Sequence, residues 1–226
     1  MLYWIYNTQE DLHMPTIESY KIPSKNRNLF LRVSKGHFAT GHSHINYYID
    51  VTMTKNRLSE AKAVAKELVS YYSHSTVVDT VLCLDGTEVI GACLANELMK
   101  ENFMSINAHQ TVYVVTPEHT SGSQLVFRDN ITPMIQGKHV LILAASVTTG
   151  YTAQAAAQAI EYYGGCVAGI CSIFSSLENC LGHEVRSVFK TADLDGYASY
   201  PSHDCPLCKS GARIDALVNS FGSSKL

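Results

Sequence analysis

The segment Lys138–Thr152 reads Lys-His-Val-Leu-Ile-Leu-Ala-Ala-Ser-Val-Thr-Thr-Gly-Tyr-Thr, and it decides the fold class of this chain. Its apolar part, Val140–Ala144, predicts a strand that is buried on both faces. The alanine-rich run that follows, Ala153–Tyr163, predicts a helix that covers this strand. Strand and helix patterns alternate along the chain, so we predict an α/β fold with an open parallel sheet flanked by helices.

The loop between this strand and this helix has the chemistry of a phosphate site. Its hydroxyl groups can donate hydrogen bonds, and Gly150 can adopt a positive φ. The helix that follows presents free N–H groups and the positive end of its dipole. The candidate phosphate-binding residues are Ser146, Thr148, Thr149, Gly150, Tyr151 and Thr152.

The same segment resembles the signature of type I phosphoribosyltransferases, an apolar strand followed by two acidic residues and a loop of the form Val-Thr-Thr-Gly-x-Thr. The resemblance implies that the loop, Val147–Thr152, binds the 5′-phosphate of phosphoribosyl pyrophosphate (PRPP), and that Mg²⁺ accompanies the pyrophosphate. The acidic pair, which holds the ribose hydroxyls in that family, is replaced by Ala144 and Ala145. Two charge-assisted hydrogen bonds, each worth about 1.5–3 kcal/mol, are therefore missing.

A second strand, loop and helix pattern precedes this one. Val77–Leu84 predicts a strand and Val89–Met99 predicts a helix, with the polar loop Asp85-Gly86-Thr87-Glu88 between them. Because ligands bind at the carboxyl ends of parallel strands, we expect the two loops to form one pocket. By resemblance this is the pyrophosphate-binding loop, where Asp85 and Glu88 need a cation between them and the pyrophosphate. The alternative is a polar turn in which Glu88 favours the helix N-terminus.

The segment Thr116–Gln124 has the composition of a flexible surface loop. Its position matches the catalytic flap of orotate phosphoribosyltransferases, which carries lysines. No Lys or Arg lies between His109 and Arg128, so His119 is the candidate proton donor and forms, with Asp85, the candidate catalytic pair. Arg128, Lys138 and His139 are further candidate charged partners.

The N-terminal part also resembles orotate phosphoribosyltransferases. Gly36-His37-Phe38, followed after a spacer by Tyr47-Tyr48-Ile49-Asp50, matches the element that forms a hood over the base. We divide the chain into an N-terminal extension and hood (1–58), an α/β core (59–200) and a C-terminal segment (201–226). The spacing of His37, His42 and His44 fits neither a helix nor a strand face shared by all three, so polar loop histidines and metal ligands both stay open.

The C-terminal segment contains Cys205-Pro206-Leu207-Cys208, which resembles a segment near the end of a subset of orotate phosphoribosyltransferases. One interpretation is half of a zinc site that Cys180 and His183 complete. The other is a tight turn with two packed or redox-labile thiols, so no resident metal ion is assigned from the sequence. The closing run Ile214–Phe221 predicts a terminal helix.

Composition excludes several classes of function. At 226 residues with 46% hydrophobic residues, the chain can bury a full core. A formal net charge of −3 without a Lys/Arg cluster argues against binding nucleic acid. No apolar run approaches about 18 residues and no secretory signal pattern is present, so we expect a cytoplasmic protein that does not enter a membrane. The resemblance implies a homodimer.

Two hypotheses of different classes follow for the function. The first is an enzyme of the phosphoribosyl-transferring type, orotate phosphoribosyltransferase-like and thus part of pyrimidine biosynthesis. It would convert PRPP and a nucleobase to a nucleoside 5′-monophosphate and pyrophosphate. The alternative is a catalytically degenerate module that binds PRPP or a nucleotide and has a regulatory role. The missing acidic pair and the missing lysines of the flap motivate the alternative.

Overall fold

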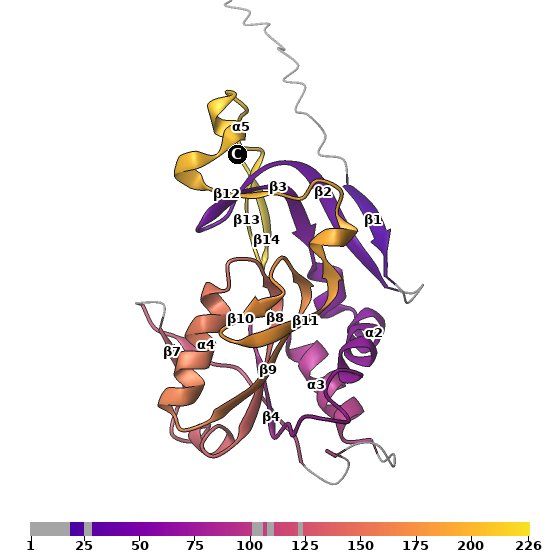
Figure 1. Ribbon diagram of the computed structural model, residues 1–226, viewed down its shortest axis with the longest axis vertical. Helices are drawn as coiled ribbons and strands as arrows, with labels where there is room; N and C mark the ends of the chain where they lie inside the picture. The colour runs from indigo at the N-terminus through magenta and orange to yellow at the C-terminus, as the bar shows by residue number, and fades with distance from the viewer. Residues whose placement is uncertain (1–18, 25–28, 101–105, 108–110, 122–123) are drawn as a thin grey trace, which may run out of the picture.

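The computed structural model describes residues 19–24, 29–100, 106–107, 111–121 and 124–226. Residues 1–18 and 25–28 of the predicted N-terminal extension and hood (1–58) therefore lie outside the described residues. The described chain forms two six-stranded β-sheets, and Figure 1 shows one of them flanked by helices and the other above it. No helix among these residues is long and apolar enough to cross a bilayer.

The main sheet has the strand order β10-β11-β9-β8-β4-β5. Five of its strands are parallel to their neighbours, and β10 pairs antiparallel with β11 at one edge. The strands are β4 (Thr80–Cys83), β5 (Tyr113–Val115), β8 (His139–Val147), β9 (Cys166–Ser175), β10 (Asn179–Cys180) and β11 (His183–Lys190). The predicted parallel α/β sheet is confirmed.

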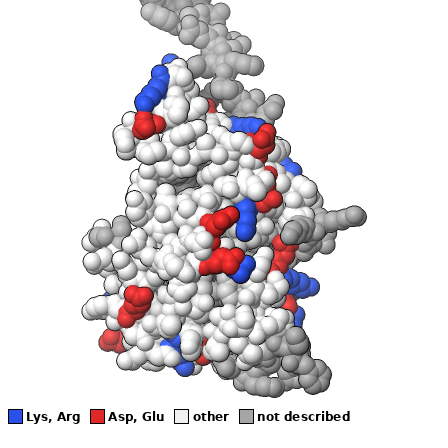
Figure 2. All heavy atoms as spheres, viewed as in Figure 1, with Lys and Arg blue, Asp and Glu red and all other residues white. Residues whose placement is uncertain are grey.

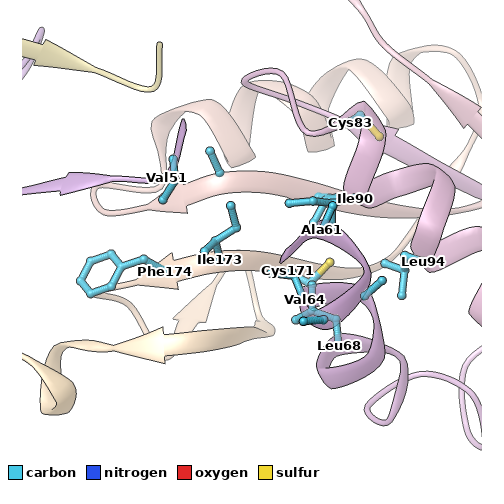
Figure 3. Close-up of a cluster of buried hydrophobic side chains, with 14 of the residues drawn as sticks. Val51, Ala61, Val64, Leu68, Cys83, Ile90, Leu94, Cys171, Ile173 and Phe174 are labelled. Atoms are coloured by element: carbon cyan, nitrogen blue, oxygen red, sulfur yellow. The ribbon is translucent and has the colours of Figure 1, made fainter. Parts of the chain in front are cut away.

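Helices cover both faces of this sheet. The helices beside it are α1 (Thr52–Asn56), α2 (Leu58–Val69), α3 (Glu88–Leu98) and α4 (Tyr151–Tyr162), whereas the short α5 (Pro206–Lys209) lies beside the second sheet (Figure 1). Strand β8 explains the arrangement, because Leu141 and Leu143 share one buried cluster with α2 and α3, whereas Val140 and Ile142 share another with α4. Figure 3 shows the first of these clusters. A strand buried on both faces needs the continuous apolar run that the sequence displays.

The second sheet combines both ends of the described chain. Its order is β12-β3-β2-β13-β14, with β1 also paired to β2. The strands are β1 (Ser19–Pro23), β2 (Phe30–Ala39), β3 (Ser43–Asp50), β12 (Ser199–Pro201), β13 (Ala216–Asn219) and β14 (Gly222–Lys225). The segment assigned to the hood and the C-terminal segment thus contribute strands to one sheet.

The predicted terminal helix over Ile214–Phe221 is wrong, because this run forms β13 and the turn into β14. Residues alternate there between buried and exposed, with Ala216 and Val218 buried and Leu217 and Asn219 exposed. That period of two belongs to a strand. A run of eight residues is also too short for helical spacing to be decisive.

The remaining elements are short. A hairpin of β6 (Glu118–His119) and β7 (Leu125–Val126) occupies the predicted flap segment. Three 3-10 turns lie at Thr132–Met134, Thr191–Asp193 and Ser202–Asp204. Figure 2 shows acidic and basic side chains scattered over one face, without a basic patch among the described residues there.

Candidate functional site

A cavity of about 280 Å³ lies between the carboxyl end of the main sheet and the second sheet. The βα loops after β4 and β8 form one wall, and residues of the second sheet form the other. The lining residues are Thr40, Gly41, His42, Ile45, Tyr48, Ile49, Val51, Asp85, Ser146, Thr148, Thr149, Thr152, Tyr197, Val218, Asn219 and Ser220. Four of the six candidate phosphate-binding residues, and Asp85 of the second loop, therefore line one cavity.

The loop after β8 turns into α4 through Gly150. This glycine has a φ of 80° and is the N-cap residue of α4, with no side-chain cap bonded to the helix end. The first amide bonded along the helix is that of Gln154, which donates to the carbonyl oxygen of Gly150 at 2.8 Å. The three preceding amides thus have no partner along the helix, and such amides are the groups that bind anions.

The segment after β9 supports the phosphate loop from behind. Ser175 donates through its hydroxyl to the carbonyl oxygen of Val147 at 3.0 Å, and Ser176 does the same to Thr148 at 3.0 Å. A Cβ atom at Gly150 would lie 3.1 Å from Cys180 Sγ. The positive φ favours glycine at this position, and the two serine hydroxyls hold the backbone on either side of Val147 and Thr148.

Tyr151 stands outside the cavity. Its side chain is 60% exposed, and its ring centroid lies 5.3 Å from that of His42 in the turn between β2 and β3. The tyrosine is therefore positioned at the rim, where it contacts the opposite wall, and does not fill the space in front of the loop.

Asp85 reaches the position beside the two alanines. It follows β4, whose register with β8 pairs Cys83 with Leu143, and it has a φ of 58°. The Asp85 carboxyl accepts hydrogen bonds from the Ser220 hydroxyl and from the Ala145 amide. Burial raises the pKa of this carboxyl, while these hydrogen bonds and the nearby Lys55 and His119 act in the opposite direction.

Lys55 is a buried cation beside the cavity that sequence reasoning missed. Its Nζ donates to the carbonyl oxygens of Asp85 at 2.6 Å and Ser220 at 2.7 Å, and the residue is only 4% exposed. Burial lowers the pKa of Lys55, and the nearby carboxylates of Asp85, Glu88 and Asp50 oppose that change. The lysine thus joins a loop of the main sheet to the second sheet. No sequence signal marked it, because its partners are backbone carbonyls distant in the chain.

The other residues of the predicted pyrophosphate loop do not line the cavity. The Thr87 hydroxyl donates to the carbonyl oxygens of Leu84 at 2.8 Å and Leu143 at 3.1 Å, so it ties β4 to β8. Glu88 is exposed at the start of α3, and Gly86 has a φ of 76°. The structure therefore brings only Asp85 of these four residues to the cavity.

The flap hairpin carries little positive charge. His119 is exposed on β6 and does not line the cavity, although its charge affects the pKa of Asp85. Arg128 forms an ion pair with Glu118 at 2.6 Å across the hairpin. Lys138 and His139 lie at the amino end of β8, the end opposite to the phosphate loop, where His139 contacts Asp79 at 3.0 Å.

The wall formed by the second sheet is apolar and aromatic. Ile45, Ile49 and Val218 contribute aliphatic surface, and Tyr48 and Tyr197 contribute rings. The hydroxyl of Tyr197 is buried and has no hydrogen-bond partner among the described residues. Burial raises the pKa of Tyr197 to about 12, so it is a neutral hydrogen-bond donor at physiological pH. Such a surface fits a flat ring with a polar edge.

The histidines and cysteines singled out in the sequence are arranged in an unexpected way. Side-chain donor atoms of His37, His44, Cys205 and Cys208 all lie within 4.8 Å of one another. Cys180 and His183 face each other in the β10–β11 hairpin and are not members of this cluster. The suggested pairing of Cys205 and Cys208 with Cys180 and His183 is therefore wrong. His37 lies in β2 and His44 in the neighbouring strand β3, and both cysteines are far along the chain from them, so sequence spacing alone did not reveal the set.

Comparison with known proteins gives low similarity values. No protein-family model matches the chain. An orotate phosphoribosyltransferase from Mycobacterium tuberculosis has 18% identity and a TM-score of 0.45, over 67% of this chain and 85% of that one. An adenine phosphoribosyltransferase from Leishmania donovani has 16% identity and a TM-score of 0.47, over 67% and 73%. A UMP synthase from the same organism has 18% identity and a TM-score of 0.46, over 66% and 31%.

Proposed function

We propose that this chain is a type I phosphoribosyltransferase-like protein that binds a 5′-phosphorylated ribose in the 280 Å³ cavity. The observation that carries the proposal is the convergence of Ser146, Thr148, Thr149, Thr152 and Asp85 on that one cavity. The resemblance of Val147–Thr152 to the family loop supports the same assignment. Three helix amides and four hydroxyls supply enough donors for the three oxygens of a phosphate monoester.

The favoured reaction transfers the phosphoribosyl group of PRPP to a nucleobase. The bond from C1′ to the pyrophosphate oxygen breaks, the bond from C1′ to a ring nitrogen forms, and a nucleoside 5′-monophosphate and pyrophosphate leave. The transition state has oxocarbenium character, so the protein must anchor the phosphate and stabilise the negative charge of the leaving group. The hood resemblance makes orotate the expected base.

Each wall of the cavity has a role in this proposal. The loop after β8 anchors the 5′-phosphate, and the apolar wall with Tyr48 and Tyr197 holds the base. The Asp85 carboxyl lies at the Ala145 amide, so it is the group available to replace the missing acidic pair at the ribose hydroxyls. Lys55 adds a fixed positive charge near the cavity and positions Asp85 through its backbone.

Asp85 is also the residue that would hold Mg²⁺. One carboxylate together with substrate phosphate oxygens is a common ligand set for this ion, and Asp85 lines the cavity. When bound, Mg²⁺ neutralises pyrophosphate charge. His119 remains the candidate proton donor, and it has to approach from the exposed hairpin.

A second candidate function is binding without turnover. No Lys or Arg lies between His109 and Arg128, and Arg128 itself forms an ion pair with Glu118. The hairpin therefore presents little cationic charge to pyrophosphate. Pyrophosphate release from PRPP and orotate with Mg²⁺ separates the two functions. An enzyme releases pyrophosphate in step with orotidylate formation. A binding module shows heat of orotidylate binding in calorimetry and no release.

Two variants make that assay specific. Thr149→Val removes a hydroxyl that lines the cavity and keeps the side-chain shape, whereas Thr111→Val changes an exposed threonine before β5, away from the cavity. Loss of orotidylate binding in the first variant alone supports the site. Equal binding in both variants and the wild type contradicts it. We further expect a cytoplasmic homodimer, which light scattering of the purified chain tests for its oligomeric state.

A further inference from the structure

We propose that His37, His44, Cys205 and Cys208 bind one zinc ion that fastens the C-terminal segment to the β2–β3 hairpin. The four residues come from β2, from β3 and from the start of the short α5. His37 and Cys205 are buried, and Cys208 is exposed. Two neutral imidazoles with two thiolates form a ligand set that structural zinc sites use. This inference does not rest on the proposed transferase function.

The distances between the donor atoms fit a tetrahedral ion. His37 Nε2 lies 3.1 Å from His44 Nδ1 and 3.6 Å from each of the two Sγ atoms. Cys208 Sγ lies 3.2 Å from His44 Nδ1. Zinc bonds of about 2.0–2.1 Å to nitrogen and about 2.3 Å to sulfur give tetrahedral edges of about 3.3 Å between nitrogens and about 3.6 Å between nitrogen and sulfur. The cluster is therefore already the size of the coordination shell.

The environment of His37 orients its ring for metal binding. Its Nδ1 lies 3.1 Å from the carbonyl oxygen of Ala212 and also 3.1 Å from the carbonyl oxygen of Arg213. Carbonyl oxygens only accept, so Nδ1 carries the proton and Nε2 has a lone pair directed at the cluster. A ligand histidine whose other nitrogen donates to a backbone carbonyl is the usual outer-shell arrangement of zinc sites. The His37 amide is also held, by the Asp215 carboxylate at 2.7 Å.

The cluster lies where the fold needs a cross-link. Strand β13 pairs with β2 at only two registered positions, Ala216 with Phe38 and Leu217 with Ala39. The local apolar cluster is small, with four buried residues: Phe38, Ile45, Ala216 and Val218. A zinc ion joining β2, β3 and α5 would hold the turn between the two strands, whose residues Thr40–His42 line the cavity. The ion would thus stabilise one wall of the cavity without touching the ligand.

The competing interpretation of Cys205 and Cys208 is a redox pair of thiols. A redox pair needs no histidine, yet both imidazoles direct a nitrogen toward the sulfurs. Convergence of all four donors on one point favours a metal ion over a disulfide.

Metal content of the purified full chain tests the proposal. The chain is produced with zinc in the medium, purified under reducing conditions, dialysed extensively and analysed by plasma mass spectrometry. We expect about one zinc per chain, because four-ligand sites hold the ion tightly. Replacement by cobalt(II) should give the visible absorption of a tetrahedral site and the charge-transfer absorption of thiolate ligands. A chelator strong enough to remove the ion should lower the melting temperature.

Matched variants assign the ligands. Cys208→Ser changes an exposed ligand and should lose at least nine-tenths of the zinc while circular dichroism stays that of a folded chain. Cys166→Ser, at another exposed cysteine, and Cys180→Ser, at the partner suggested by the sequence, should both keep it. Wild-type protein without stoichiometric zinc, a Cys205–Cys208 disulfide formed in the presence of zinc, or zinc loss in Cys180→Ser but not in Cys208→Ser would each overturn the proposal. His44→Asn repeats the test from the histidine side.

Discussion

The two sheets that enclose the cavity are built in opposite ways. The main sheet uses residues Thr80–Lys190, pairs β8 with β9 along nearly their whole length, and is covered by helices on both faces. The second sheet joins strands from both ends of the described chain. Leu31, Val33 and Tyr47 of its strands β2 and β3 belong to the large cluster that includes α2 and α3, whereas the cluster around β13 has only four buried residues, Phe38, Ile45, Ala216 and Val218. The main sheet is therefore packed on both faces, whereas the second sheet shares part of that core through β2 and β3 and has few buried side chains around β13.

The two walls of the cavity therefore have different proposed roles in ligand binding. The phosphate loop belongs to the main sheet, and hydrogen bonds from Ser175 and Ser176 fix its backbone. The opposite wall belongs to the second sheet. Its position relative to the loop is held by the shared apolar core under β2 and β3, by Lys55 and by the proposed zinc cluster. Affinity for phosphate should thus follow changes in the main sheet, and selectivity for the base should follow changes in the second.

Lys55→Met removes the polar link between the sheets and should have the largest effect. It removes the charged donor from two carbonyl oxygens, those of Asp85 and Ser220. Hydrogen bonds to charged groups contribute about 1.5–3 kcal/mol each, so we expect the free energy of unfolding to fall by about 2 kcal/mol or more. Urea unfolding measures this. Lys66→Met, on α2 and away from both carbonyls, is the control and should be nearly neutral.

Gly150→Ala tests the main-sheet side alone. A residue with Cβ at a φ of 80° costs about 1–2 kcal/mol, and here the added atom also approaches Cys180 Sγ. We expect lower stability and at least a tenfold loss of orotidylate affinity in calorimetry. Gly182→Ala is the matched control, because Gly182 has a φ of 79° and no neighbouring atom within 4 Å of the added Cβ. It should lose stability only; loss of ligand affinity there would contradict the account.

Thr149→Val sharpens the assignment of the phosphate to the loop. Removing one hydrogen bond to a charged ligand costs about 1.5–3 kcal/mol, which corresponds to a roughly 10- to 150-fold weaker affinity for orotidylate. The melting temperature should change little, since the residue is exposed at the cavity. A binding titration with free orotate serves as the comparison, because orotate carries no phosphate and should be affected much less.

Asp85→Asn should have the smallest effect, and it should raise the stability of the fold where the other variants lower it or leave it unchanged. Because the pKa of Asp85 is raised in the folded state, the folded chain retains a proton that the unfolded chain has lost. The contribution of Asp85 to stability is therefore complete below the ordinary pKa of about 3.9 and falls as the pH rises through the raised pKa. The advantage of Asp85→Asn over the wild type should grow from pH 4 to pH 7. Thermal melts measure it, with the exposed Asp129→Asn as control.

The main sheet could be predicted from the sequence because its signals are local. Val140–Ala144 is a continuous apolar run, and the loop and helix that follow carry their own turn and spacing signals. In parallel sheets the βα loops meet at the carboxyl ends of the strands, where ligands bind. The position of Asp85 and Thr149 at one cavity was therefore also expected.

The second sheet and the sites that depend on it could not be predicted to the same extent. Lys55 donates to backbone carbonyls, one of them 165 positions away in the chain, and no pattern encodes such a contact. His37 and Cys205 are 168 positions apart, so the spacing of histidines or cysteines taken separately gave the wrong ligand set. The apolar spacing of Ile214–Phe221 predicted a helix, and this was wrong because pairing with the distant strand β2 decides the structure of that segment.

A crystal structure of the complex with orotidylate tests the central claim most directly. We expect the phosphate to lie within about 2.7–3.2 Å of the Thr149 hydroxyl and of the first amides of α4, with the ribose hydroxyls toward Asp85. A nucleotide bound elsewhere, or a phosphate loop that stays empty at saturating orotidylate, would contradict it.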